Sequence, residues 1–139
     1  MYLSIFANSK VLRINRKGGD VPSNPVFSVT FELDGQQFHA LNGGPMFKFN
    51  EAVSMMVQCD TQDELDTVWE QLLQGGGKAQ QCGWLKDKFG LSWQVVPKRL
   101  GELLQDPDVE KTSRVMQSLM QMTKLDIAVL QAAFDNQSS

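Results

Sequence analysis

Two segments of the chain alternate polar and apolar side chains in a way that could build a ligand-binding surface. Successive side chains of a β-strand point to opposite faces, so every second residue shares a face. Hydroxyl and amide groups on one face can fix the orientation of a small molecule. The apolar rows must pack on a helix, so we expect a pocket to be lined by the opposite rows, which are Ser54, Met56, Gln58, Ser92 and Gln94. The alternative is that these groups only hydrogen-bond one another and water.

Two further residues are candidates for the same pocket. Trp84 lies beside a glycine-containing turn and could wall a pocket by stacking, with a place in the core as the alternative. Asn42 joins the lining if the strand that ends there has the expected register. The neighbouring residues Lys86, Asp87 and Lys88 are expected to form a solvated turn. The candidate ligand-binding set therefore has seven members.

Acid–base chemistry has one histidine to draw on, His39. An imidazole suits proton transfer near neutral pH. Strict alternation places His39 on the opposite face from Ala40 and Asn42, and no partner for a catalytic triad is recognisable. A structural role for this histidine is the alternative, and the sequence assigns no catalytic residue.

Composition and short motifs exclude several function classes. The formal net charge is −3, and Lys and Arg form no long run, so the basic patch that nucleic acid requires is missing. No apolar stretch has the length of a membrane span. Cys59 and Cys82 lack C-x-x-C spacing and fit reduced thiols in a cytoplasmic protein. Phosphate-binding, hydrolase and zinc-cluster motifs are absent. We expect a cytoplasmic protein with neither nucleic-acid nor membrane partners.

The first half of the chain reads as antiparallel strands. A short strand is expected over 11–16, before a loop rich in Gly and Pro. Asp34-Gly35 is a turn signal, and a strand over 37–42 should return antiparallel to the one before the turn. The strand before the turn has the alternation of a half-buried strand, with Phe27, Val29, Phe31 and Leu33 on its apolar face.

The second half predicts a strand, a helix, two strands and then helices. After a strand over 53–59, Thr61 and Glu64 form a capping box for a helix over 61–73 that Gly75-Gly76-Gly77 ends. Residues 78–84 and 91–96 read as strands. Beyond Pro97 the pattern is helical, with Asp106-Pro107 and Asp126 as helix starts. The sum is an α+β protein, a mixed antiparallel sheet with helices on one face, in a single domain over 1–139.

Two glycine-containing segments, Ala40–Pro45 and Cys82–Pro97, carry a family resemblance. The chain resembles the PhnB-like branch of the vicinal-oxygen-chelate (glyoxalase/bleomycin-resistance) superfamily, whose members are often labelled 3-demethylubiquinone-9 3-methyltransferase. The resemblance implies two βαβββ modules around a shared cup. It implies a partial, N-terminally incomplete first module over 1–45, a second module over 51–97 and C-terminal helices over 98–134. An open reading frame cut short is the alternative explanation of the incomplete module.

The resemblance also bears on metals and cofactors. Enzymes of the superfamily bind a divalent metal through four strands, and the first of these ligands has no counterpart in this chain. The other three positions map near Ala40 and to Ser54 and Gln94, and alanine and serine are poor ligands. We expect no standard metal site. The methyltransferase label would imply a glycine-rich turn between a strand and a helix, whereas Gly75-Gly76-Gly77 follows a helix, so we expect no cofactor.

Three functions remain open. The first is binding of an unidentified small organic molecule in a cup-shaped sheet pocket. The second is an enzyme of the same superfamily that uses a metal or side-chain acid–base chemistry on an unknown substrate. The third is a degenerate member that acts through protein–protein contact. The apolar face of residues 27–33 requires a cover, for which we expect a second copy in a homodimer or the C-terminal helices.

Overall fold

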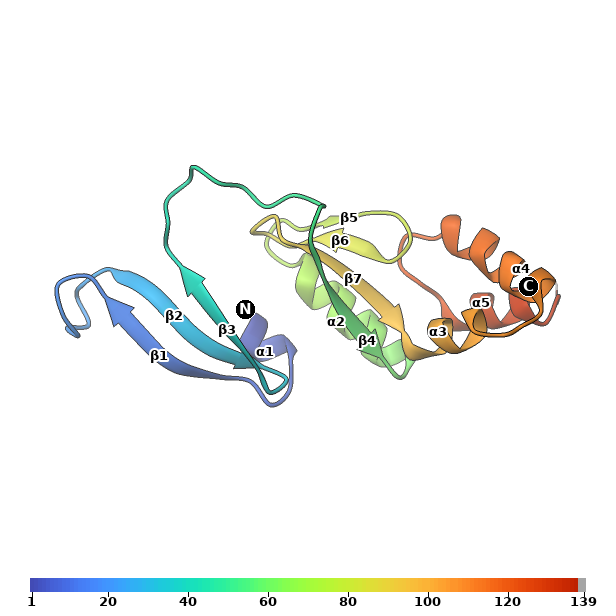
Figure 1. Cartoon of the computed structure of the whole chain (residues 1–139), viewed down its shortest axis with the longest axis horizontal. Helices are drawn as coiled ribbons and strands as arrows, with labels where there is room; N and C mark the ends of the chain where they lie inside the picture. Colours follow the sequence, from blue (N-terminus) through green and yellow to red (C-terminus); the bar gives the residue numbers. More distant parts are fainter. Residues whose placement is uncertain (138–139) are drawn as a thin grey trace. The chain divides into compact units, whose positions relative to one another are not determined.

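The computed structural model describes residues 1–137 and divides into two compact units, Met1–Lys48 and the part that begins at Phe49. Figure 1 shows strands and one short helix in the first unit, and a sheet followed by helices in the second. The α+β class and the glyoxalase-like fold are confirmed. The single domain over 1–139 stays a prediction, and its residues 138 and 139 lie outside the described part. None of the described helices has the length and apolar character needed to cross a membrane.

The first unit holds helix α1 (Tyr2–Ile5) and strands β1 (Lys10–Arg16), β2 (Val26–Leu33) and β3 (Gln36–Leu41). The strands form an antiparallel sheet in the order β1-β2-β3. Asp34 and Gly35 both have positive φ, at 50° and 78°, which is the geometry of a tight hairpin turn. The strand, turn and return predicted for this region are therefore confirmed.

Burial in β2 follows its alternation only in part, since Leu33 is buried but the other residues of the apolar face are not. Ser28 and Thr30 are buried, while Phe27 on the other face is 42% exposed. Both small side chains lie on the central strand, where longer side chains of the neighbouring strands cover them. Ser28 accepts a hydrogen bond from Asn15, and Thr30 bonds the Nδ1 atom of His39. The apolar face of this sheet is thus the more open one within the first unit.

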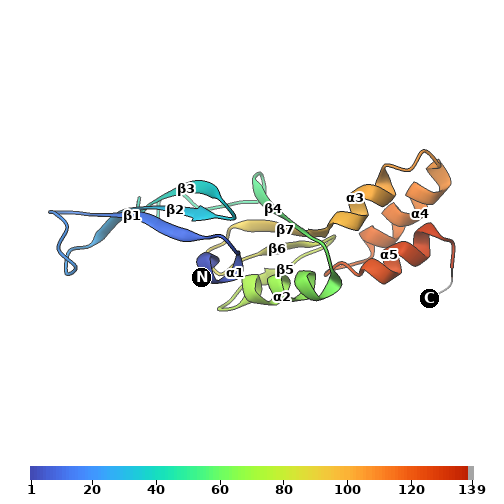
Figure 2. The ribbon, with the colours of Figure 1, turned by 90° about the horizontal axis from the view of Figure 1, so that it is seen from below.

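The second unit begins with a βαβββ module. It comprises β4 (Ser54–Cys59), α2 (Gln62–Leu73), β5 (Lys78–Ala79), β6 (Trp84–Lys86) and β7 (Ser92–Pro97). The strand order is β4-β7-β6-β5, with β4 parallel to β7 and the other pairs antiparallel. Figure 2 shows α2 along one side of these strands. The core lies between them, formed by Leu65, Val68, Trp69, Leu72, Leu85, Trp93 and Val95.

Two local predictions for the module need correction. The strand expected over 78–84 is interrupted, because Cys82 has a φ of 60° and Gly83 one of 82°. The amides of Cys82 and Gly83 donate to the carbonyls of Met122 and Thr123 and not to a neighbouring strand. Two short strands, β5 before this interruption and β6 after it, replace the single predicted strand. In the capping box, Thr61 accepts from the Glu64 amide as expected, but the Glu64 carboxylate accepts from the amide of Asp60.

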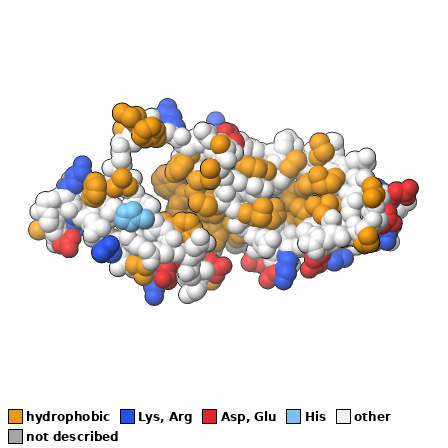
Figure 3. Space-filling view, in the orientation of Figure 1, with side chains coloured by type: hydrophobic (Ala, Val, Ile, Leu, Met, Phe, Trp, Pro, Cys, Tyr) orange, Lys and Arg blue, Asp and Glu red, His pale blue; other side chains and the backbone are white. Residues whose placement is uncertain are grey.

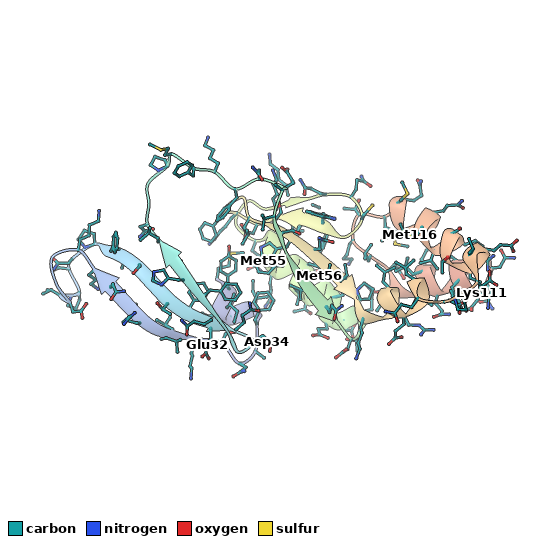
Figure 4. The ribbon with its side chains drawn as sticks, viewed as in Figure 1. Glu32, Asp34, Met55, Met56, Lys111 and Met116 are labelled. Atoms are coloured by element: carbon teal, nitrogen blue, oxygen red, sulfur yellow. The ribbon has the colours of Figure 1, made fainter. Side chains whose placement is uncertain are left out.

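Three helices follow the module: α3 (Lys98–Leu104), α4 (Val109–Met120) and α5 (Ile127–Phe134). Helix α4 begins two residues later than predicted, since Asp108 and not Asp106 accepts from its first amides. Asp106 instead accepts from the amide of Asp108. Asp126 caps α5 as predicted. Figure 4 labels Lys111 and Met116 on α4, and the Lys111 ammonium lies 5.0 Å from the ring centre of Phe134.

Specific contacts attach these helices to the module. The side chain of Gln62, at the start of α2, donates to the carbonyl of Leu125 and accepts from the amide of Ile127. Leu125 is fully buried and lies against Gly83. The Arg114 guanidinium of α4 donates to the carbonyls of Ala133 and Phe134 at the C-terminal end of α5. The helices and the module therefore share one buried core.

Candidate ligand-binding face

The sheet of the second unit has one face packed on α2 and one face that carries polar side chains. Strand pairing sets Ser54, Ser92 and Lys86 side by side across β4, β7 and β6. The next row across the same strands holds Met56, Gln94 and Trp84. Alternation puts both rows on the side opposite Trp93 and Val95, which are buried in the core. Six side chains of three strands thus share one face.

A hydrogen bond joins two of the predicted residues. The Gln94 side-chain amide donates to the Ser54 hydroxyl oxygen at 2.9 Å, and both side chains are half-buried. This bond fixes the amide orientation of Gln94 and leaves its carbonyl oxygen and the Ser54 proton as further bonding groups. The pair can therefore act as an oriented donor–acceptor group on the polar face.

Ser92 lies at the centre of the first row and is fully buried. Its hydroxyl oxygen has no hydrogen-bond partner within the described part of the chain. Nearly all buried polar atoms in folded proteins are hydrogen-bonded, because an unpaired one costs about 1–3 kcal/mol. Ser92 is therefore an unsatisfied donor and acceptor among the predicted site residues.

Lys86 was not among the predicted site residues, and the structure places it at the edge of the same row. Its ammonium forms an ion pair with the Glu51 carboxylate, and the Lys86 side chain is 29% exposed. The hydrogen bond from Lys86 lowers the pKa of Glu51, and the Gln80 side chain adds a smaller effect in the same direction. Lys86 follows Trp84 by two residues, so alternation from Trp84 is the signal that could have identified it.

Asp87 contradicts the expected solvated turn over 86–88. Its carboxylate is 3% exposed and lies on the core side of the sheet. One oxygen accepts from the amides of Phe89 and Leu91, and the other accepts from the indole nitrogen of Trp93 at 2.9 Å. Asp87 therefore organises the turn between β6 and β7, while Lys86 belongs to β6 and only Lys88 is exposed.

The other predicted residues are more dispersed. Met56 is exposed on β4, where Figure 4 labels it beside Met55, and Gln58 is exposed further along the same strand. Trp84 is half-buried. Asn42 belongs to the first unit, where its side chain donates to the carbonyl of Val26. The contribution of these residues to a pocket stays a prediction.

The metal positions implied by the resemblance are divided between the two units. Ala40 lies in the first unit, opposite Val29 in the sheet, whereas Ser54 and Gln94 are bonded to each other. Within residues 1–137, no three His, Cys, Asp or Glu side chains are grouped so that they could hold a metal ion. Burial, with the charges of Glu64 and Asp60, raises the pKa of the Cys59 thiol to about 11, so this cysteine stays protonated at neutral pH.

A separate groove of about 560 Å³ lies on the second unit. It is formed where α2 and α5 begin, beside α3. It contains none of the predicted site residues, and its lining is Asp60, Gln62, Arg99, Asp126, Ile127, Ala128 and Gln131. Two of the lining side chains are bonded to each other, since Arg99 donates to Gln131.

Comparison with known proteins finds similarity to a protein family and to solved structures. A family model described as 3-demethylubiquinone-9 3-methyltransferase matches residues 1–96. A solved PhnB protein from Bacillus cereus, described with the same methyltransferase name, is 34% identical with a TM-score of 0.59, and the match covers 68% of this chain and 84% of that one. A solved protein from Staphylococcus aureus is 24% identical with a TM-score of 0.28, over 68% of this chain and 78% of that one. None of the curated proteins matches.

Proposed function

The chain belongs to the family described as 3-demethylubiquinone-9 3-methyltransferase, and from this premise we propose that it binds a small organic molecule on the polar face of its second unit. The observation that carries the proposal is Ser92, which lies between Ser54 and Lys86 in the row. Its hydroxyl is fully buried and has no hydrogen-bond partner among the described residues. A ligand that displaces the side chains covering Ser92 and bonds its hydroxyl would remove the cost of that unpaired group. The proposed lining is the predicted set on this face together with Lys86.

We do not extend the proposal to methyl transfer, although the family and its Bacillus cereus member carry that name. Gly75, Gly76 and Gly77 connect the end of α2 to β5, so their amides do not open a helix toward a nucleotide. Gly43 and Gly44 lie in the first unit, after β3, and precede a loop. The polar face instead offers hydrogen-bonding groups suited to recognition.

A fragment screen by ligand-observed NMR tests the proposal with the full chain. We expect at least one neutral or charged fragment to bind, and Gln94→Leu to weaken it about tenfold by removing one oriented hydrogen-bonding group. Gln117→Leu is the matched control, because Gln117 is exposed on α4. Fragments whose binding is unchanged in Gln94→Leu, or a screen without a bound fragment, would contradict the proposed site.

We further propose that the protein acts as a cytoplasmic homodimer. Two unpaired cysteines, Cys59 and Cys82, support the location. The dimer is supported by the first unit, in which Leu33 is the one apolar side chain that counts as buried among the described residues. Isolated three-stranded sheets need an apolar face to be covered. Figure 3 shows hydrophobic side chains at the surface, and in this unit they include Val11, Ile14 and Phe27.

Light scattering coupled to size-exclusion chromatography measures the oligomeric state. We expect twice the mass of one chain, and a shift toward one chain when Phe27 and Ile14 are both replaced by Ser, because an apolar contact is then lost. Replacing Met116 and Met120 by Ser on α4 is the control for a general effect of surface polarity. A mass of one chain at all concentrations would count against the dimer.

A further inference from the structure

The Glu51–Lys86 ion pair occupies one end of the row that contains Ser92. Glu51 lies in the turn before β4, and its side chain is 52% exposed, against 29% for Lys86. Ion pairs at the protein surface contribute little to stability, because water screens them. A competing anion could therefore displace Glu51 from Lys86 at little cost. The carboxylate of Glu51 already demonstrates that this end of the row accommodates a carboxylate.

Ser92 is an independent observation at the same place. It is the direct cross-strand neighbour of Lys86 on β6 and of Ser54 on β4. Cross-strand neighbours have Cβ atoms about 4.5–5.5 Å apart, so one small group can reach both the hydroxyl and the ammonium. The Ser92 hydroxyl is buried and unpartnered, and it can donate one hydrogen bond.

We propose that this row recognises the carboxylate of a small organic acid, which replaces Glu51 at Lys86 and accepts a hydrogen bond from Ser92. The single ammonium balances one negative charge and the hydroxyl is neutral, which favours a carboxylate over a doubly charged phosphate. The body of the acid lies along the second row, where Trp84 offers an aromatic face and Met56 an adaptable apolar one. This inference rests on the proposed binding function and names the ligand class for it.

Glu51 then acts as an internal competitor of the ligand. Its carboxylate holds Lys86 in place when the face is empty and leaves when an acid binds. Removing its charge should therefore strengthen acid binding, whereas removing the Lys86 charge should weaken it. These opposite signs distinguish recognition of a carboxylate from a general effect on folding.

Benzoate and its neutral analogue benzamide are the probes, titrated by ligand-observed NMR into the full chain. We expect benzoate to bind about tenfold more tightly than benzamide, the ratio that one charged hydrogen bond provides. Lys86→Met should abolish this preference, and Lys86→Arg should keep it. Glu51→Gln should increase benzoate affinity several-fold, and Ser92→Ala should reduce it. Lys88→Met is the control, because Lys88 is exposed outside the row.

Three outcomes decide the inference. Equal binding of the two probes, unchanged in Lys86→Met, would overturn carboxylate recognition but leave the proposed pocket intact. If neither probe binds at any concentration up to its solubility limit, the inference is overturned. The fragment screen with Gln94→Leu tests the proposed pocket independently of this result. A benzoate preference that survives Lys86→Met would place the acid elsewhere and also overturn it. Circular dichroism of each variant verifies that the fold is retained.

Discussion

Replacing Asp87 by alanine should lower the free energy of unfolding by about 3–5 kcal/mol, because three donors lose a shared acceptor, and hydrogen bonds to charged groups contribute about 1.5–3 kcal/mol each without adding fully. The Asp87 carboxylate is 3% exposed, and it accepts from the amides of Phe89 and Leu91 and from the Trp93 indole. Alanine leaves the Trp93 indole nitrogen without its acceptor in the core and removes the acceptor of two part-buried amides. Urea denaturation at neutral pH, followed by tryptophan fluorescence, measures the change.

Three control variants separate the effect of the lost hydrogen bonds on stability from the effect of the lost charge. Asp87→Asn keeps one acceptor oxygen and should cost less than Asp87→Ala. Trp93→Phe removes the indole donor, so its cost and that of Asp87→Ala should add incompletely in the double variant. Asp63 is an exposed carboxylate in the first turn of α2, and Asp63→Ala should cost about 0.5 kcal/mol. An Asp87→Ala loss similar to that of Asp63→Ala would show that Asp87 does not organise the turn.

Replacing Gly77 by alanine should destabilise the protein by about 1–3 kcal/mol, as other overpacked sites do. A Cβ atom at Gly77 would lie 2.8 Å from the Leu73 Cα atom and from the Lys86 carbonyl oxygen. Both obstacles are backbone, so the end of α2 or strand β6 must move. The displaced Lys86 belongs to the proposed binding row, so the variant should also weaken the site. Thermal unfolding followed by circular dichroism gives the change in stability.

Gly101 offers a matched control, because its replacement by alanine should raise stability where the same change at Gly77 lowers it. It lies within α3, has ordinary backbone geometry, and a Cβ atom there would have no neighbour within 4 Å. Alanine is the better helix former, so Gly101→Ala should stabilise the protein by about 0.4–1 kcal/mol. If both substitutions shifted the melting temperature in the same direction, close packing at Gly77 would not explain the result.

The regular elements could be predicted because their signals are local. The alternation from Phe27 to Leu33, the turn at Asp34 and Gly35, and the cap at Thr61 each lie within a few residues of the element they define. The break before β6 could not be predicted in this way. It depends on Cys82 and Gly83 bonding to residues about 40 positions later in the chain.

The same limit applies to the candidate site. Alternation placed Ser54 and Gln94 on one face, and their hydrogen bond confirms that shared face. It did not identify Lys86, because a run of Lys, Asp and Lys is typical of a solvated turn. Asp87 is buried only because Trp93, six residues later, brings an indole nitrogen to its carboxylate. Whether these residues bind a ligand stays a prediction.

The pairing of β4 with β7 also constrains how the second unit folds. These neighbours open and close the module in sequence, with α2, β5 and β6 between them. Contacts between distant residues form late, because a long loop must first be closed. During synthesis, β4 would therefore stay unpaired until β7 is made, while β5 and β6 can already pair with each other. The sheet that carries the polar rows is complete only once its last strand is available, so no shorter intermediate of this chain presents the binding row.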